Sequence, residues 1–188
     1  MKRYLRAAIC VFYSIIKFYF IKLFHFKGFS FTLLNLISPF TELEIGKNAK
    51  MHFGKMIRVR SGSKLRVRKG AEMQIGRNTF LNHGCIFTAH ERISIGENVQ
   101  FGPNVLIYDH DHDYKQKHGL KDLLYKTTPV KIGDNVWIGA NTVILRGTKI
   151  GNNCVVGAGS IIKGDYPDNM VITQKRDTKQ FRIVSDGV

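Results

Sequence analysis

The 188-residue chain is poor in cysteine, and its few cysteines show no pairing pattern. Cys10, Cys85 and Cys154 are odd in number and include no Cys-x-x-Cys spacing, which argues against a disulfide framework and against a cysteine-based zinc site. Cys85 and Cys154 fall at small inward positions of a sequence repeat described below. We therefore expect both to be reduced core residues, as in a protein of the cytoplasm.

Acidic residues are also scarce, since 14 Asp and Glu against 29 Lys and Arg leave a formal charge of +15. Residues 58–69 hold six basic residues and no acid, and alternation with Val59, Leu65 and Val67 puts those charges mostly on the solvent side of strands. This segment is either an ordinary solvated face or a surface for an anionic lipid or a polyanionic acceptor. Nucleic acid is not expected, because no binding motif or array of stacking aromatic residues accompanies the charge.

The N-terminal region lacks an uncharged run long enough to span a bilayer. The run Ala7–Ile16 has ten residues, against the roughly 20 that a spanning helix needs, and no small-residue cleavage site follows it, so a signal peptide is not expected. Apolar residues recur at steps of three and four, and Lys2, Arg3, Arg6, Ser14 and Lys17 occupy the opposite arc. The pattern predicts a basic amphipathic helix. Its apolar face either lies in a membrane interface, which we favour, or packs on the end of the domain or on a neighbouring subunit.

A six-residue repeat organises residues 132–162. Aliphatic residues occupy every sixth position, at Ile132, Ile138, Ile144, Ile150, Val156 and Ile162. Four positions after each aliphatic comes a small or modest side chain, as at Thr142, Thr148 and Ser160. A period of six fits neither a helix nor a simple strand and indicates a stacked repeat. We expect a solenoid of triangular cross-section, with both positions pointing inward and with Gly and Asn at the corners, where left-handed backbone angles cost them little.

These repeats resemble the hexapeptide-repeat family, which implies an all-β fold, a left-handed parallel β-helix, here with an N-terminal amphipathic helical segment. The expected bounds are residues 1–40 for the N-terminal segment, residues 41–166 for the β-helix with an inserted loop at 108–129, and residues 167–188 for a C-terminal tail. The uncharged stretch Gly28–Thr41 is expected to lie on the same surface as the helix or to cap the open coil. Register slips of two residues before Ile75 and Ile95 are interpreted as enlarged corners.

The repeat stops between Tyr108 and Pro129, and a gap of about twenty residues within a compact domain is usually functional. It carries the run Asp109-His110-Asp111-His112-Asp113. The order of three blocks, 95–105, this loop and 129–139, resembles the acetyltransferase branch of the family, which includes the maltose and galactoside O-acetyltransferases. The loop is more similar to members that modify capsule, O-antigen or exopolysaccharide sugars. The resemblance implies an acetyl-CoA-dependent O-acetyltransferase acting on a sugar hydroxyl of a glycan, either free, polymeric or lipid-linked.

The resemblance implies that one loop histidine is the general base for the acceptor hydroxyl, and counting from Asn104 places His112 at that position. An imidazole suits the task because it titrates near working pH. His110, two residues away, is the alternative base. Asp109, Asp111 or Asp113 could orient the imidazole or hydrogen-bond the sugar.

Asn82 matches the family's acceptor-site asparagine, and its alternative role is to cap a corner of the solenoid. The family often has an acidic residue eight positions later, where this chain has His90. That departure leaves the identity of the acceptor open, as it leaves open the choice between hydroxyl and amino acceptor.

The resemblance also implies a groove for the pantetheine arm of acetyl-CoA between adjacent copies. The matching small residues with approachable backbone amides are Gly139, Ala140, Gly157 and Ala158, with Lys163 nearby, unless they serve only the solenoid. Trp137 is expected to point outward beside the loop and wall the site, or to pack in an interface.

The chain departs from the family's usual closing segment. Lys175 and Arg176 are assigned to the nucleotide phosphates from their charge alone. No metal is expected in the acetyltransferase interpretation.

The outward position of the repeat is rich in apolar residues, which implies a partner surface. These are Phe80, Ile86, Leu106, Trp137, Val143, Val155 and Ile161. We expect a homo-oligomer, and the resemblance favours a homotrimer. From the reduced cysteines and the basic amphipathic N-terminus, we expect a cytoplasmic protein in peripheral contact with the inner face of an anionic plasma membrane.

Two other classes of function stay open. The γ-class carbonic anhydrases share the β-helix and bind zinc through three histidines, and His83, His90, His110 and His112 offer enough imidazoles. The block Asn135–Gly139 and the long loop fit acyltransferases better. The second alternative is a non-catalytic, membrane-docked scaffold that uses the basic face.

Overall fold

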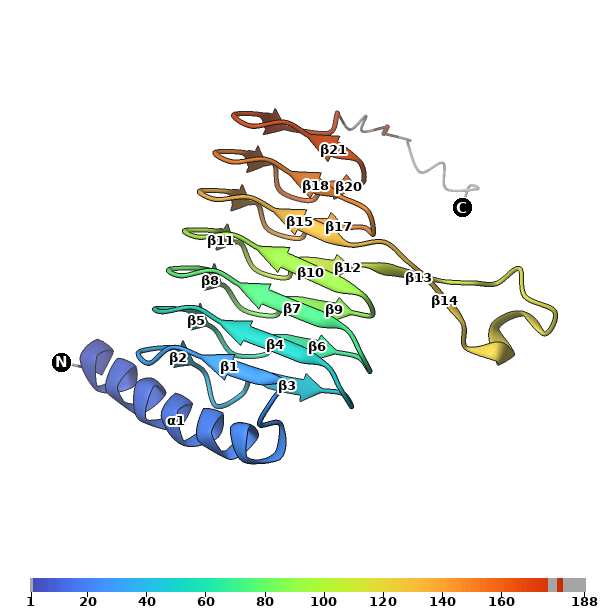
Figure 1. The fold of residues 1–188 in the computed structure, drawn as a ribbon. Coiled ribbons are helices and arrows are strands. Elements are labelled where there is room, and N and C mark those ends of the chain that lie inside the picture. The colour runs from blue at the N-terminus through green and yellow to red at the C-terminus, as the bar shows by residue number, and fades with distance from the viewer. Residues whose placement is uncertain (1, 176–178, 181–188) are drawn as a thin grey trace, which may run out of the picture.

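Three parallel sheets form the walls of a solenoid with one helix across its N-terminal end (Figure 1). The computed structural model describes residues 2–175 and 179–180, and for helix residues 2–4 and 6 it describes the backbone alone. Within these three sheets, each inner strand pairs in parallel with the strand one coil before and one coil after it. The expected parallel β-helix with an N-terminal helix is therefore confirmed.

The sheets contain seven, seven and six strands. Sheet A consists of β1 (Phe29–Phe31), β4 (Lys50–Phe53), β7 (Glu72–Ile75), β10 (Arg92–Ile95), β15 (Val130–Ile132), β18 (Lys149–Ile150) and β21 (Asp165–Tyr166). Sheet B consists of β2 (Leu36–Ile37), β5 (Arg58–Val59), β8 (Phe80–Leu81), β11 (Gln100–Phe101), β16 (Trp137–Ile138), β19 (Val155–Val156) and β22 (Val171–Ile172). Sheet C consists of β3 (Glu42–Ile45), β6 (Lys64–Val67), β9 (Ile86–Ala89), β12 (Leu106–Tyr108), β17 (Val143–Ile144) and β20 (Ile161–Ile162).

The repeat positions behave as the six-residue period predicts. The aliphatic residues from Ile132 to Ile162 are buried, and so are Thr142, Thr148 and Ser160. Each of these three hydroxyls donates a hydrogen bond of 2.7–2.8 Å to the carbonyl three residues earlier, which closes a corner without an unpaired buried donor. Cys85 and Cys154 are buried free thiols, as expected, and burial raises the pKa of Cys85 to about 11.

Asparagines turn many of the corners, as the sequence predicts. Asn78, Asn98, Asn135 and Asn153 all have φ between 55° and 56°, in the left-handed region where asparagine is enriched. Their side-chain amides also hydrogen-bond from one coil to the next, with Nδ2–Oδ1 distances of 2.9–3.2 Å. The asparagines thus shape the corners through their backbone angles and also connect successive corners through side-chain hydrogen bonds.

The register slips are not enlarged corners, and that interpretation is wrong. Both residues of each slip lie within one longer strand, Met73 and Ile75 in β7 and Ile93 and Ile95 in β10, and all four are buried. A four-residue strand turns alternate side chains inward, so it presents two core residues where a two-residue strand presents one.

The coils also extend beyond the expected bounds of 41–166. The stretch Gly28–Thr41 does not merely cover the open coil, because it contains β1 and β2, which pair with β4 and β5 as the first coil. At the other end, β22 at Val171–Ile172 pairs with β19. The strands at these ends, of two or three residues, are too short to show an alternation in the sequence.

Helix α1 (Lys2–Phe24) uses polar side chains to close the open edge of the first coil. Ser14 is buried and accepts a hydrogen bond from the Ile37 amide at 2.8 Å. Lys17 donates to the Thr41 carbonyl at 2.6 Å, and Lys22 donates to the Phe29 carbonyl at 2.8 Å. Burial lowers the pKa of Lys17. These bonds satisfy backbone groups that the terminal strands would otherwise leave unpaired.

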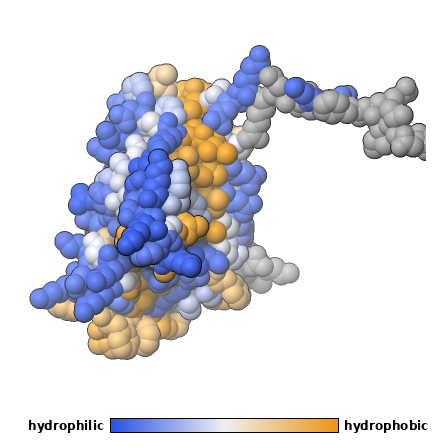
Figure 2. All heavy atoms as spheres, turned by 90° about the vertical axis from the view of Figure 1, so that its right-hand side faces the viewer, coloured by the Kyte–Doolittle hydropathy of each residue, from blue (hydrophilic) through white to orange (hydrophobic). Residues whose placement is uncertain are grey.

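The apolar arc of α1 consequently faces away from the solenoid. Among the aromatic side chains of α1 that the structure describes, Phe18 alone is buried, with its ring centroid 5.0–5.5 Å from those of Phe29, Phe31 and Phe53. The exposed large side chains are Leu5, Ile9, Phe12, Ile16, Tyr19, Phe20, Leu23 and Phe24. Figure 2 shows the apolar residues that gather at this lower end of the molecule. By length and composition, Ala7–Phe24 would suffice to cross a membrane, although the uncharged run Ala7–Ile16 alone would not.

The outward apolar residues of the coils form two columns, one on each of two sheets. Ile86, Leu106, Val143 and Ile161 lie in register on sheet C. Phe80, Trp137 and Val155 lie on sheet B, where Gln100 separates Phe80 from Trp137. The corresponding column of sheet A is polar and includes His52, Gln74, Ser94, Lys131 and Lys149. The outer faces of sheets B and C therefore suit contact with another protein surface, whereas the outer face of sheet A suits exposure to solvent.

Candidate active site

A β-hairpin replaces the corner between sheets C and A where the repeat stops. β13 (His110–His112) pairs antiparallel with β14 (Tyr125–Thr127), and the 3₁₀ helix η1 (Gly119–Asp122) lies between them. The Thr128 amide donates to the Asp109 carbonyl at 2.9 Å and closes the base of the hairpin. The chain then rejoins sheet A at β15, which pairs directly with β10.

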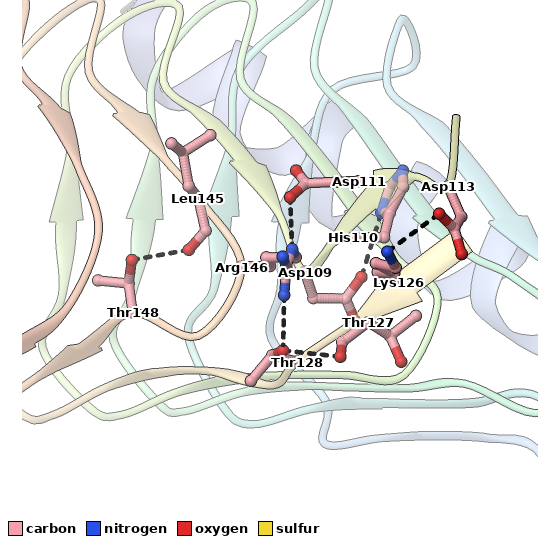
Figure 3. A network of polar contacts seen from close by, with 10 residues as sticks. All are labelled: Asp109, His110, Asp111, Asp113, Lys126, Thr127, Thr128, Leu145, Arg146 and Thr148. Atoms are coloured by element: carbon pink, nitrogen blue, oxygen red, sulfur yellow. Dashed lines mark hydrogen bonds and ion pairs between the residues drawn. The ribbon is translucent and has the colours of Figure 1, made fainter. Parts of the chain in front are cut away.

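Arg146, at the same corner one coil later, fastens the hairpin to the solenoid. Its guanidinium forms an ion pair with Asp111 and donates to the Thr128 hydroxyl at 3.1 Å (Figure 3). Because side chains alternate along a strand, Asp111 faces Arg146 while His110 and His112 lie on the other face of β13. The position of both histidines thus depends on a contact made behind them.

Asp109 is fully buried and holds His110. Its carboxylate accepts hydrogen bonds from the backbone amides of His90 and Glu91, both at 2.8 Å, and lies 3.2 Å from His110 Nδ1. Burial by itself would raise the pKa of Asp109, but the hydrogen bonds from His110 and from the two amides outweigh it and hold the pKa below its ordinary value. An ionised Asp109 orients the His110 ring and leaves Nε2 of that ring free to accept.

His90 and His110 stack, with ring centroids 3.8 Å apart and an interplanar angle of 33°. Burial, followed by the neighbouring His110, lowers the pKa of His90 to about 4. His90 is therefore neutral near pH 7 and contributes an uncharged aromatic surface where the family often has a carboxylate.

The side chain of His112 is exposed and makes no hydrogen bond or ion pair with any residue that the structure describes. Its ring packs on Tyr125 with centroids 4.8 Å apart, and Tyr125 also packs on His90 at 4.2 Å. Both ring nitrogens of His112 are consequently available to a ligand, whereas one nitrogen of His110 is engaged with Asp109.

The three histidines His90, His110 and His112 line one open cleft of about 630 Å³. Tyr108, Tyr125 and Thr88 contribute further walls, and Arg66, Arg68 and Lys69 contribute its basic side. No Asp or Glu is among these lining residues. The cleft therefore combines accessible imidazole bases with positive charge and aromatic surface.

The aspartates of the loop do not line the cleft. Asp109 lies beneath it, Asp111 pairs with Arg146, and Asp113 pairs with Lys126 at 3.0 Å (Figure 3). The expectation that Asp109 or Asp111 binds the sugar directly is not supported, because all three carboxylates are occupied by protein donors. Orientation of an imidazole, the other expected role, fits Asp109.

Asn82 lies at the opposite end of sheet C from His112, because it follows β8 at the corner between sheets B and C. Its side-chain oxygen accepts from the His83 amide at 2.9 Å, which is the corner-capping alternative. Within one chain, Asn82 and the histidine cleft do not come together.

The small residues expected to hold coenzyme A lie at that same corner. Gly139 and Ala140 follow β16, and Gly157 and Ala158 follow β19, so the second pair lies one coil after the first. A Cβ on Gly139 would lie 2.4 Å from the Ala158 backbone nitrogen, so close stacking of the coils alone explains this glycine. Gly157 is less crowded, since its nearest neighbour would be the Thr173 methyl group at 3.3 Å.

The remaining expected site residues are spread over two corners. Trp137 points outward and is 57% exposed, but it lies on sheet B and not beside the hairpin of its own chain. Lys163 follows β20 at the hairpin corner, and Lys175 follows β22 near the corner with the small residues. Arg176 lies outside the described residues.

The zinc alternative gains no support from the arrangement of side chains. Among the described residues, no group of three or more His, Cys, Asp or Glu side chains is placed to hold a metal ion. His83 is hydrogen-bonded to the Ser61 hydroxyl at 2.9 Å and does not line the cleft with His90, His110 and His112.

The sequence did not single out two residues that build the site. Tyr125 packs against His90 and His112, and Arg146 fastens the hairpin. The only signal for Arg146 was that it is a charged residue directly after Ile144-Leu145, at the corner that follows the loop by one coil. Tyr125 carries no signal in a segment without a repeat.

Comparison with known proteins supports the resemblance inferred from the repeats. The family model described as bacterial transferase hexapeptide (six repeats) matches residues 129–164. The galactoside O-acetyltransferase of Escherichia coli K12 is 39% identical over 97 residues, which cover 52% of this chain and 47% of that protein. The solved maltose O-acetyltransferase of Clostridium difficile 630 has 37% identity and a TM-score of 0.57, covering 70% of this chain and 64% of that chain.

One further solved structure contains the acyl donor. A hexapeptide-repeat containing acetyltransferase from Vibrio cholerae, complexed with acetyl coenzyme A, is 30% identical with a TM-score of 0.52, and the match covers 57% of this chain and 58% of that one. The chain spans about half the length of the curated relatives it matches. The relatives are acetyltransferases, and the predicted resemblance to hexapeptide-repeat acetyltransferases is confirmed.

Proposed function

We propose that this hexapeptide-repeat protein is an acetyl-CoA-dependent O-acetyltransferase that modifies a sugar hydroxyl of a cell-surface glycan such as a capsule, O-antigen or exopolysaccharide. The observation that carries the proposal is the cleft at the hairpin, where His112 presents two unengaged nitrogens beside a second, carboxylate-oriented imidazole. The relatives named for galactoside and maltose acetylation support a sugar as the acceptor.

His112 is the proposed general base. Its free nitrogen accepts the proton of the acceptor hydroxyl while the hydroxyl oxygen attacks the acetyl carbonyl of the thioester. As the tetrahedral intermediate collapses, the carbon–sulfur bond breaks and the imidazolium returns the proton to the leaving thiolate. His110, held by Asp109, keeps its place beside the acceptor, and the neutral His90 adds no charge to compete with the proton transfer.

The complete site is proposed to form between copies of the chain. Asn82 and the small residues Gly139, Ala140, Gly157 and Ala158 lie at the B–C corner, whereas His112 and Lys163 lie at the C–A corner. The apolar columns on sheets B and C suit the packing of one copy against the next. In a homotrimer, the B–C corner of one copy would face the hairpin of its neighbour, with Trp137 and Lys175 on the donor side.

Replacement of the proposed base tests this assignment. His112→Ala should reduce kcat for acetyl transfer by about 10²–10⁴-fold without a change in the unfolding midpoint, because the His112 side chain is exposed and makes no hydrogen bond to a described residue. His110→Ala is the comparison, and it should reduce kcat less. A larger loss in His110→Ala than in His112→Ala would transfer the role to His110, and unchanged turnover in both would contradict the mechanism.

We also propose that α1 docks the protein on the cytoplasmic face of the plasma membrane. Ser14, Lys17 and Lys22 of α1 bind the solenoid, while Phe12 and Leu23, on the other side, are 68% and 74% exposed. An apolar helix face with basic residues along the same segment is typical of helices that lie in a membrane interface. Crossing the membrane would remove Ser14, Lys17 and Lys22 from the strand edge that they close.

Flotation with vesicles that contain anionic lipid tests the docking face. The triple variant Ile9→Ser/Phe12→Ser/Phe20→Ser should lose co-flotation and keep its unfolding midpoint, because none of the three side chains is buried. Val171→Ser, an exposed apolar residue of the last coil, is the control and should float like the unmodified chain. Unchanged flotation of the triple variant would refute the assignment.

A further inference from the structure

The basic side of the histidine cleft is not explained by the transfer reaction itself. Arg66 belongs to β6, and Arg68 and Lys69 directly follow it. Arg66, Thr88 and Tyr108 are register neighbours on β6, β9 and β12, so they form an outward column that ends at the hairpin. The base needs no cation near it, and three cations on one wall therefore point to a feature of the acceptor.

Both guanidiniums are held in place by carboxylates of the coil below. Arg66 Nε and Nη2 donate to the two oxygens of Glu42 at 2.6 and 3.3 Å, and Arg68 Nη1 pairs with Glu44. A guanidinium has five N–H donors, so each arginine keeps donors that these carboxylates do not use. Oriented guanidiniums with spare donors match the oxygens of a phosphate group.

Lys69 adds a positive charge that is not neutralised. In the described part of the chain it makes no ion pair, whereas Glu42 and Glu44 balance the two arginines. The wall of the cleft thus keeps a net positive charge, and no lining carboxylate opposes an anionic ligand.

The column from Arg66 to Tyr108 is long enough to hold a sugar ring, and its basic end lies nearer to α1. Adjacent strands are about 4.8 Å apart, so two strand steps put Arg66 roughly 10 Å from Tyr108 along the solenoid, which leaves room for a sugar ring between the cations and the histidines. β6 is the second strand of sheet C, one step above β3 at the end that α1 closes. Figure 2 shows the polar hairpin standing out from the coils above the apolar lower end. The cations therefore lie on the side of the cleft nearer to the proposed membrane surface.

We propose that the acceptor is a membrane-embedded glycolipid whose lipid-linking phosphate or diphosphate binds Arg66, Arg68 and Lys69 while the adjoining sugar reaches His112. The inference rests on the proposed transferase function and specifies its substrate class. It assigns the three cations to acceptor recognition, and it explains how an acceptor could be held where the family's usual acidic residue is replaced by His90.

Acceptors that share one oligosaccharide test the substrate class. The glycan is supplied free, as its polyprenyl-diphosphate conjugate in vesicles, and with a carboxylated sugar in place of the phosphate. The unmodified protein should show the highest kcat/KM with the diphosphate conjugate. The double variant Arg66→Gln/Arg68→Gln should lower that kcat/KM by about tenfold or more, through KM, because charge-assisted hydrogen bonds are lost. Equal use of the free and diphosphate forms, or preference for the carboxylated glycan, would overturn the proposal.

Arg77→Gln is the matched control, because Arg77 is an exposed arginine paired with Glu97 outside the histidine cleft. It should leave the kcat/KM of every acceptor unchanged. Its unfolding midpoint, compared with that of the double variant, shows whether leaving a glutamate unpaired disturbs the coils.

Calorimetric titration with inorganic diphosphate separates this proposal from the transferase proposal. The unmodified protein and His112→Ala should bind diphosphate equally, and Arg66→Gln/Arg68→Gln should bind it at least about tenfold more weakly. If no acceptor in the panel is acetylated, the transferase proposal fails, but this titration still decides the anion site. Absence of diphosphate binding by the unmodified protein would overturn the site whatever the turnover.

Discussion

At the scale of single residues, the cleft depends on His90, whose ring is neutral near pH 7 because burial and the adjacent His110 lower its pKa to about 4. An unfolded histidine titrates near 6.5. Between these two values the unfolded chain binds a proton at this position that the folded chain does not, so the free energy of unfolding should fall as the pH drops from about 6.5 toward about 4.

His90→Phe should flatten the acid side of the stability curve. Phenylalanine keeps an aromatic ring for the stack on His110 but does not titrate, so the loss in free energy of unfolding between pH 7 and pH 5 should be smaller than in the unmodified protein. Denaturant unfolding at both pH values measures the difference. His52→Phe, an exposed histidine on sheet A, should leave the curve unchanged; a curve for His90→Phe that matches the unmodified one would contradict the pKa shift.

Asp109 acts in a separate and lower pH window. Its pKa is held below the ordinary value by the hydrogen bonds from His110, His90 and Glu91, so its contribution to stability is present near pH 7 and is lost as the pH falls below about 4. The two effects can therefore be distinguished by the pH at which stability declines.

Gly139 and Gly157 occupy equivalent corners but differ in the space around them. Gly139→Ala would bring a Cβ to 2.4 Å from the Ala158 backbone nitrogen, which must shift, and we expect the free energy of unfolding to fall by about 1–3 kcal/mol. In Gly157→Ala the nearest atom is a Thr173 methyl carbon at 3.3 Å, and the loss should be smaller. Denaturant unfolding of the two variants tests the contrast, and equal losses would contradict it.

At the scale of elements, the hairpin is held by few contacts. Arg146→Met removes the ion pair to Asp111 and the hydrogen bond to Thr128 while retaining much of the apolar stem. We expect faster amide hydrogen exchange over residues 109–128 and reduced turnover, with a change in global stability below about 1 kcal/mol because the pair is partly exposed.

Lys149→Met is the control for this prediction, since it removes an exposed ion pair to Asp165 one strand away from the hairpin corner. It should alter neither exchange in the hairpin nor turnover. Protection factors in Arg146→Met equal to those of the unmodified chain would show that other contacts hold the hairpin.

The strands and corners of residues 132–162 were predictable because each two-residue strand contributes one buried aliphatic residue, and these residues recur every six positions. The longer strands were not, because Met73 and Ile75 within one strand look like a shift of the repeat. Helix α1 was predicted as amphipathic, but Ser14 and Lys17 of its polar arc face the protein. A pattern of apolar and polar residues does not reveal that Ser14 and Lys17 meet unpaired strand edges.

At the scale of the whole molecule, two walls of the solenoid carry apolar columns and the third is polar. Ile161→Asp places a charge at the top of the sheet C column and should shift the protein from the proposed trimer toward monomer in light scattering coupled to gel filtration. Lys131→Asp on sheet A should leave the mass unchanged. Monomers in the unmodified protein, or trimers in Ile161→Asp, would contradict the proposed interface.

The grouping of the site residues could be predicted from the sequence only in part. His110 and His112 were predicted together because they are two residues apart. Asn82 and Gly139 were grouped with them through resemblance, and a single chain places them at another corner. In the proposed trimer their union would depend on an intermolecular contact, which no intramolecular pattern encodes. The sequence showed that residues 58–69 are basic. It did not show that Arg66 lies in register with Tyr108, because that alignment arises only when the coils stack.

The hairpin begins and ends at one corner, since the Asp109 carbonyl accepts from the Thr128 amide and β15 stacks on β10 as though nothing intervened. Its length and content can therefore vary without disturbing the register of the coils, and the entropic cost of a longer loop grows only by about 0.6 kcal/mol for each doubling. Under the proposed function, the hairpin supplies His110 and His112, while the coils supply the stability and the basic side of the cleft. Hairpins from relatives, transplanted between Asp109 and Thr128, should thus change the histidine side of the cleft without redesign of the core.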